Sequence, residues 1–111
     1  MEFFVEHRDN VTVVAIAGSV DALTASEVAN ALGAQVMDGR IRLVGDLSQV
    51  DYTSSAGLRA VLATLKDARS QGGDFRLAGL QPNVRKVLEL SGFLNILKVY
   101  PDVDAAVASF A

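Results

Sequence analysis

The stretch that carries most information about this chain is Asp46–Arg59, with the sequence DLSQVDYTSSAGLR. Its start is typical of the end of a buried strand, its middle of a short loop rich in hydroxyl groups, and its end of an amphipathic helix. Such a junction gathers backbone N–H groups without helical partners at the positive end of a helix dipole. Ser54 and Ser55 lie there, where a serine can cap the helix or carry a phosphate. We therefore expect the function to depend on this junction.

The composition indicates one folded domain over residues 1–111. Half of the residues are hydrophobic and the net charge is only −3, so the chain can bury a core. The basic residues are scattered, which argues against nucleic-acid binding, and the absence of cysteine excludes disulfides and thiolate metal sites. No apolar run approaches the roughly 20 residues of a membrane span. Since the N-terminus also lacks the basic start of a signal peptide, we expect a cytoplasmic protein that does not insert into membranes.

The order of the predicted elements is β-β-α-β-α-β-α-β-α. This order predicts an α/β domain with a mixed, mainly parallel sheet of about five strands and with about four helices. The first two strands are expected to form an antiparallel hairpin. The strands are predicted at residues 2–8, 11–17, 41–47, 75–79 and 96–100, and the helices follow Thr24, the Ser54–Ser55 junction, Pro82 and Asp102.

Three of the helices have clear sequence signals. Thr24 and Glu27 have the spacing of a capping box, which predicts that Thr24 caps the first helix. Asp102 is expected to cap the last helix. The apolar residues predicted to face the core are Ala25, Val28, Leu32 and Val36 in the first helix, Leu58, Val61, Leu62 and Leu65 in the second, and Val103, Val107 and Phe110 in the last.

The common catalytic motifs are absent. The sequence has no Gly-x-Ser-x-Gly pattern, no phosphate-binding glycine loop, and a single histidine, His7, in the first strand. Asp21, Asp46 and Asp51 are predicted near one edge of the sheet, where carboxylates can bind a divalent cation. The simpler interpretation is that they accept N–H groups of the loops, and for Asp46 we expect this orienting role. We expect no catalytic residue, no metal site and no cofactor.

Four segments resemble the STAS domain, the fold of bacterial anti-sigma factor antagonists. The central one is Asp46-Leu47-Ser48-x-Val50 followed by Ser55-Ala56-Gly57-Leu58. The others are Gly18-x-x-Asp21-x-x-Thr24-Ala25, Gln71–Leu77, and Pro82-x-Val84-x-x-Val87-Leu88-x-x-Ser91-Gly92. Together they span nearly the whole chain in the predicted element order.

The resemblance implies a regulatory switch and not an enzyme. In such systems the unmodified antagonist binds an anti-sigma factor that is also a serine kinase, and phosphorylation of one serine on the antagonist ends the binding. A metal-dependent serine phosphatase then resets the antagonist. The phospho-acceptor of the family corresponds to Ser55. Many relatives have Asp before this serine and Ser or Thr after it, whereas this chain has Ser54 and Ala56, so Ser54 is a competing acceptor.

The expected partner surface surrounds this serine, and the free protein is expected to be a monomer. The residues expected to contact the partner are Asp21, Thr24, Tyr52, Thr53, Ser54, Ser55, Gly57 and Arg59. Two alternatives stay open. One is an accessory subunit of a bacterial lipid-transport ABC system that is not phosphorylated. The other is a small-molecule-binding module, which predicts a cavity beside Asp46 and Tyr52.

Overall fold

The computed structural model describes all residues from 1 to 111 and contains one five-stranded sheet with the order β1-β2-β3-β4-β5. β1 is antiparallel to β2, and β2 to β5 are parallel, as predicted. The strands are β1 (Glu2–Arg8), β2 (Val11–Val20), β3 (Arg42–Thr53), β4 (Asp74–Ala78) and β5 (Val99–Tyr100). The helices are α1 (Ala25–Met37), α2 (Ser55–Ser70), α3 (Pro82–Leu90) and α4 (Val103–Ala108), with a short 3₁₀ helix η1 (Phe93–Asn95).

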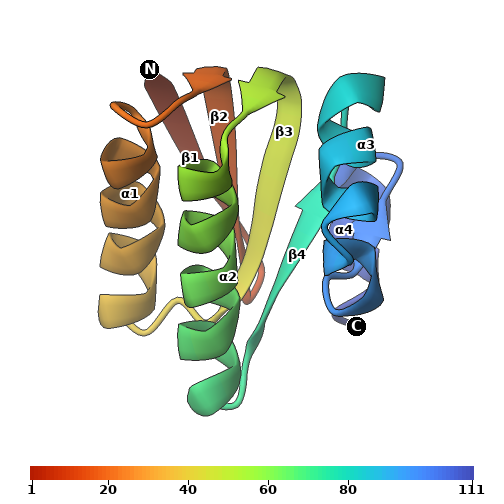
Figure 1. Ribbon diagram of the computed structural model, residues 1–111. Helices are drawn as coiled ribbons and strands as arrows, with labels where there is room; N and C mark the ends of the chain where they lie inside the picture. The colour runs from red at the N-terminus through yellow and green to blue at the C-terminus, as the bar shows by residue number, and fades with distance from the viewer.

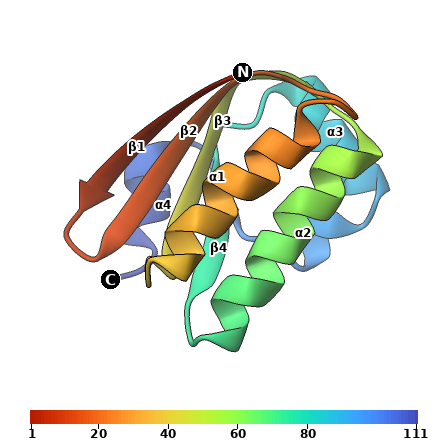
Figure 2. The same ribbon diagram turned by 90° about the vertical axis from the view of Figure 1, so that its left-hand side faces the viewer.

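The helices cover the two faces of the sheet unequally. α1, α2 and α3 pack on one face and share the larger hydrophobic cluster, and α1 and α2 lie side by side (Figures 1 and 2). α4 covers part of the other face, where Ala106 packs against Val11, Val13, Val44 and Ala78. Both faces of the sheet are therefore apolar, as expected for parallel strands covered on both sides.

The amphipathic faces of the helices lie largely as predicted. Ala25, Val28, Leu32 and Val36 of α1 are all buried, and so are Leu58, Val61 and Leu65 of α2, while Leu62 is partly buried. On α4 the most buried residue is Ala106, and the predicted Val103, Val107 and Phe110 only pack around it. The Asp102 carboxylate accepts the Ala105 N–H at 2.8 Å, which confirms the predicted cap.

The prediction for the third strand was too short. β3 continues past Leu47 to Thr53, so most of the stretch predicted as a loop is strand. Its polar residues pair with β2, with Gln49 opposite Ala17 and Thr53 opposite Val20, across two shifts of register. The exposed side chains and the irregular pairing explain why this part resembles a loop in sequence. β5 is shorter than the predicted 96–100, because Ile96 and Leu97 form a turn and a bend after η1 and only Val99 and Tyr100 pair with β4.

Thr24 is the N-cap residue of α1, as predicted, but the predicted capping box with Glu27 does not form. Thr24 precedes α1, but its side chain makes no hydrogen bond to the first turn of the helix. Its Oγ1 instead accepts the Asp21 N–H at 2.9 Å and lies 2.8 Å from the Ser19 carbonyl oxygen. The Thr24 side chain therefore closes the loop that leads into α1.

Candidate functional site

The candidate site lies at the edge of the sheet where β2 and β3 end and α1 and α2 begin (Figure 1). The Ser54 N–H donates to the Val20 carbonyl oxygen at 2.7 Å, which joins the two strand ends. The loop from Val20 to Ala25 and the turn from Thr53 to Ser55 are therefore neighbours. This arrangement brings together the two motifs that the sequence analysis placed at one surface.

The two serines at the start of α2 have different environments. Ser54 is the N-cap, with extended backbone angles, and its Oγ accepts the Gly57 N–H at 3.2 Å. Ser55 is the first residue of the helix, its side chain is exposed, and it makes no side-chain hydrogen bond within the chain. The structure thus divides the two roles that a serine can have here. Ser54 caps the helix, and Ser55 presents a free hydroxyl to solvent.

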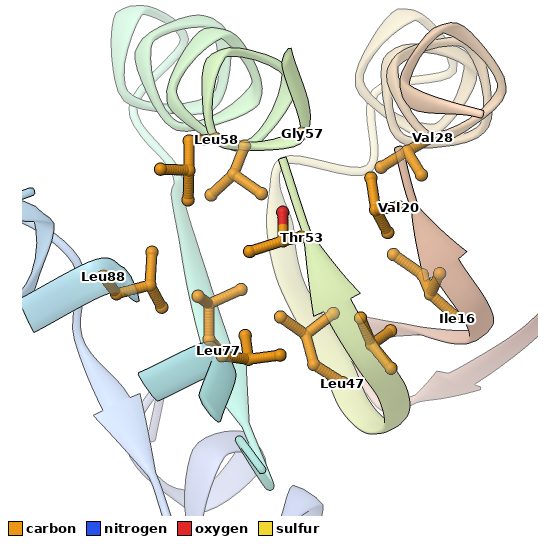
Figure 3. Close-up of a pocket in the computed structure, with 12 residues that line it drawn as sticks. Ile16, Val20, Val28, Leu47, Thr53, Gly57, Leu58, Leu77 and Leu88 are labelled. Atoms are coloured by element: carbon orange, nitrogen blue, oxygen red, sulfur yellow. The ribbon is translucent and has the colours of Figure 1, made fainter. Parts of the chain in front are cut away.

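Gly57 allows α2 to approach the ends of the strands closely (Figure 3). A Cβ atom at this position would lie 2.5 Å from Thr53 Oγ1 and 2.7 Å from Val20 Cγ1. Both distances are shorter than normal van der Waals contact, so a larger residue would force the helix outward. Gly57 is buried and Thr53 is partly buried, so both support the surface from below.

Asp21 organises the loop before α1. Its Oδ1 accepts the N–H groups of Leu23 and Thr24, each at 2.9 Å, and lies 3.1 Å from Thr24 Oγ1. The hydrogen bonds from the backbone and hydroxyl of Thr24 lower the pKa of the Asp21 carboxyl below its ordinary value. Asp21 is therefore a carboxylate at neutral pH.

The other two aspartates do not lie with Asp21 in a common cluster. Asp46 is inside β3, opposite Ala15 and Ala78, and its Oδ1 accepts the Ser48 N–H at 3.1 Å. Asp51 accepts the Ser19 hydroxyl at 2.7 Å, and its backbone carbonyl accepts the Asn83 side-chain amide. No group of three or more His, Asp or Glu side chains is placed to hold a metal ion.

Three exposed side chains complete this surface. Tyr52 in β3 is 50% exposed, and Arg59 in α2 is exposed and makes no ion pair. Leu23, which the sequence analysis did not single out, is 85% exposed in the loop before α1. The sequence pattern does not predict whether a leucine between a loop and a helix is buried or exposed, so only the structure reveals the exposure of Leu23.

The cavity below this surface is small and apolar. It has a volume of about 20 Å³ and is lined by residues that include Ile16, Leu47, Leu58 and Leu88 (Figure 3). This volume is close to that of one water-sized probe sphere. Asp46 lines an open groove with Phe4, Val13 and Ala15, but Tyr52 lines no cavity or groove. The cavity predicted beside both Asp46 and Tyr52 for a small-molecule module is therefore not found. No helix is both long and apolar enough to cross a membrane.

Comparison with known proteins identifies the family. The STAS domain family matches residues 3–106. The chain is 40% identical over 110 residues to BtrV of Bordetella bronchiseptica, a protein named as an anti-sigma factor antagonist, and the match covers 99% of this chain and 95% of BtrV. It is 30% identical over 97 residues to an anti-sigma-B factor antagonist of Listeria monocytogenes, with 86% of this chain and 84% of that protein covered.

A solved structure agrees with these sequence matches. The crystal structure of an anti-sigma factor antagonist from Mycobacterium paratuberculosis has a TM-score of 0.89 and 33% sequence identity to this chain. The superposition covers 97% of this chain and 92% of the other. These matches extend over the same elements as the four motifs of the sequence analysis. The chain therefore belongs to the STAS domain family.

Proposed function

We propose that this protein is an anti-sigma factor antagonist whose binding to its partner ends when Ser55 is phosphorylated. The observation that carries the proposal is the division of roles at the start of α2. Ser54 Oγ is engaged with the Gly57 N–H, whereas the Ser55 hydroxyl is exposed and free. The names of the related proteins support a regulatory role and not an enzymatic one.

In the unmodified state the protein binds an anti-sigma factor that is also a serine kinase, and the sigma factor is then free to act in the cytoplasm. The contact surface consists of the loop before α1, with Asp21 and Thr24, and the start of α2. Tyr52 fits the role of an anchor, because exposed tyrosines often carry a large share of interface energy. Thr53, Ser54 and Gly57 hold this surface in shape, since they contact one another below it.

Phosphorylation adds close to two negative charges at pH 7. The N-terminus of α2 tolerates these charges, since its N–H groups and its dipole favour an anion, so the domain keeps its fold. The complex does not tolerate them, because the dianion must lose water in a packed interface. Since about 1.4 kcal/mol corresponds to a tenfold change in affinity, a loss of a few kcal/mol releases the partner. A metal-dependent serine phosphatase removes the phosphate and restores the monomeric, binding-competent protein.

The proposal is tested by locating the phosphate. The protein is purified from its own host, incubated with ATP and host extract, and analysed by mass spectrometry across residues 52–59. Ser55→Ala should abolish the modification, and Ser54→Ala should retain it. A phosphate on Ser54 would move the acceptor by one residue. Absence of phosphate from both serines would contradict the proposal and favour the accessory subunit of a transporter.

A further inference from the structure

Arg59 is a cation without a partner beside the proposed phosphorylation site. Four arginines of the chain pair with carboxylates within the 2.6–3.8 Å range, namely Arg8, Arg40, Arg69 and Arg76. The Arg59 side chain has no ion pair and no hydrogen bond, and it is exposed on α2. Its guanidinium group is therefore available to an anion.

The position of Arg59 on α2 directs it toward Ser55. The two residues are four apart in one helix, so they are neighbours on its surface, with about 6 Å between their Cβ atoms. Both are exposed, whereas Leu58 and Val61 of the same helix are buried. A negative group that precedes a positive one by four residues is the more favourable order in a helix. A phosphate on Ser55 is negative and precedes Arg59 by four residues, so the pair has this favourable order.

Other charged residues belong to the elements that meet at this edge. Asp21 precedes α1, Glu27 lies in its first turn, and Asp51 lies near the end of β3, where it accepts the Ser19 hydroxyl. Arg85 and Lys86 come from α3. The N–H groups of Ser55 and Ala56 also lack helical acceptors, because of their place in the first turn. Among these groups, Arg59 is the cation that lies on α2 one turn from Ser55.

We propose that Arg59 is the counter-ion of the phosphate on Ser55 and that phosphorylation thereby withdraws Arg59 from the partner. The inference rests on the function proposed above. In the unmodified protein, Arg59 is free to pair with an acidic group of the anti-sigma factor. In the phosphorylated protein, it pairs with the phosphate of its own helix. Phosphorylation then removes an attractive contact and adds a repulsive charge in the same event.

The pairing can be measured without a kinase or a partner. Phosphoserine is incorporated at position 55 during translation, and its second ionisation is followed by ³¹P NMR as the pH varies. The pKa of this step is about 6 in an unpaired phosphoserine. Replacing Arg59 by Gln should raise the phosphate pKa by about 0.3 units, the size expected for a surface pair at this spacing. Arg59→Lys keeps the charge but loses the planar fork of donors, so it should give an intermediate shift.

Lys66→Gln is the matched control, because it removes one positive charge from an exposed position of the same helix. Lys66 is about 16 Å along the helix axis from Ser55, beyond the Debye length at physiological salt, so its loss should shift the pKa by less than about 0.1 units. Equal shifts for Arg59→Gln and Lys66→Gln, or no shift for Arg59→Gln, would overturn the pairing. This result is independent of whether the host phosphorylates Ser55, which the mass spectrometry decides. The two failures are therefore distinguishable.

Discussion

At the scale of single residues, Gly57 is the position where the smallest change should disturb the site. Gly57→Ala places a methyl group 2.5 Å from Thr53 Oγ1 and should move the start of α2. Overpacking of this kind typically costs about 1–3 kcal/mol of the free energy of unfolding, measurable by urea denaturation.

Gly33→Ala in α1 is the control, because nothing lies within 4 Å of its added Cβ. It should stabilise the protein by up to about 1 kcal/mol, since alanine is the better helix former. Equal effects of the two substitutions would contradict this account.

At the scale of the helix, the two serines should separate stability from modification. Ser54→Ala removes the only side-chain cap of α2 and should lower the free energy of unfolding by about 1 kcal/mol. Ser54→Asp keeps an acceptor at the cap and should restore most of this loss. Ser55→Ala should leave stability nearly unchanged, because its hydroxyl makes no hydrogen bond. Thermal unfolding of the three variants tests this, and a loss of stability in Ser55→Ala larger than in Ser54→Ala would reverse the assignment.

At the scale of the whole molecule, Asp74 joins three elements at the end of the domain away from the site. Its carboxylate accepts from Arg69 Nε at 2.9 Å, from Arg76 Nε at 3.0 Å and from the Phe75 N–H at 3.0 Å. Arg76 also donates to the Ser109 carbonyl oxygen at 2.7 Å and stacks 4.0 Å from the Phe110 ring centroid. The buried Asp74 carboxylate thus connects α2 to β4, and Arg76 extends the network to the residues after α4.

This network predicts an acid-sensitive contribution to stability. Burial acts to raise the pKa of Asp74, but hydrogen bonds from Arg76 and Arg69 outweigh it and hold the pKa below its ordinary value. A carboxyl with a lowered pKa stabilises the fold above the unfolded pKa of about 3.9, and this contribution is lost as the pH falls through the folded pKa. Asp74→Asn should therefore cost about 1–3 kcal/mol at pH 7 and less at pH 3.

The control for this prediction is Asp67→Asn. Asp67 is exposed on α2 and its carboxylate makes no ion pair. Urea denaturation at several pH values should show little change for this variant. A cost for Asp74→Asn that is the same at pH 3 and pH 7 would show that the carboxylate charge does not matter.

The sequence by itself determined the element order, the antiparallel hairpin, the buried faces of α1 and α2, and the family. The first three of these features follow from local periodicity and from glycines and prolines at element boundaries, which neighbours along the chain specify. The family followed from the resemblance of four motifs to the STAS domain. The length of β3 was not predicted, because its exposed polar residues resemble a loop in sequence. They form a strand because they pair with β2. The predicted capping box did not form either, because the Thr24 hydroxyl makes hydrogen bonds with the backbone of Asp21 and Ser19. Only the tertiary structure showed that Ser54 caps α2, because the cap depends on the extended backbone of Ser54 between β3 and α2. It also revealed the Asp74 network, since Arg76, which donates to Asp74, also donates to Ser109, and residues 76 and 109 are far apart in sequence.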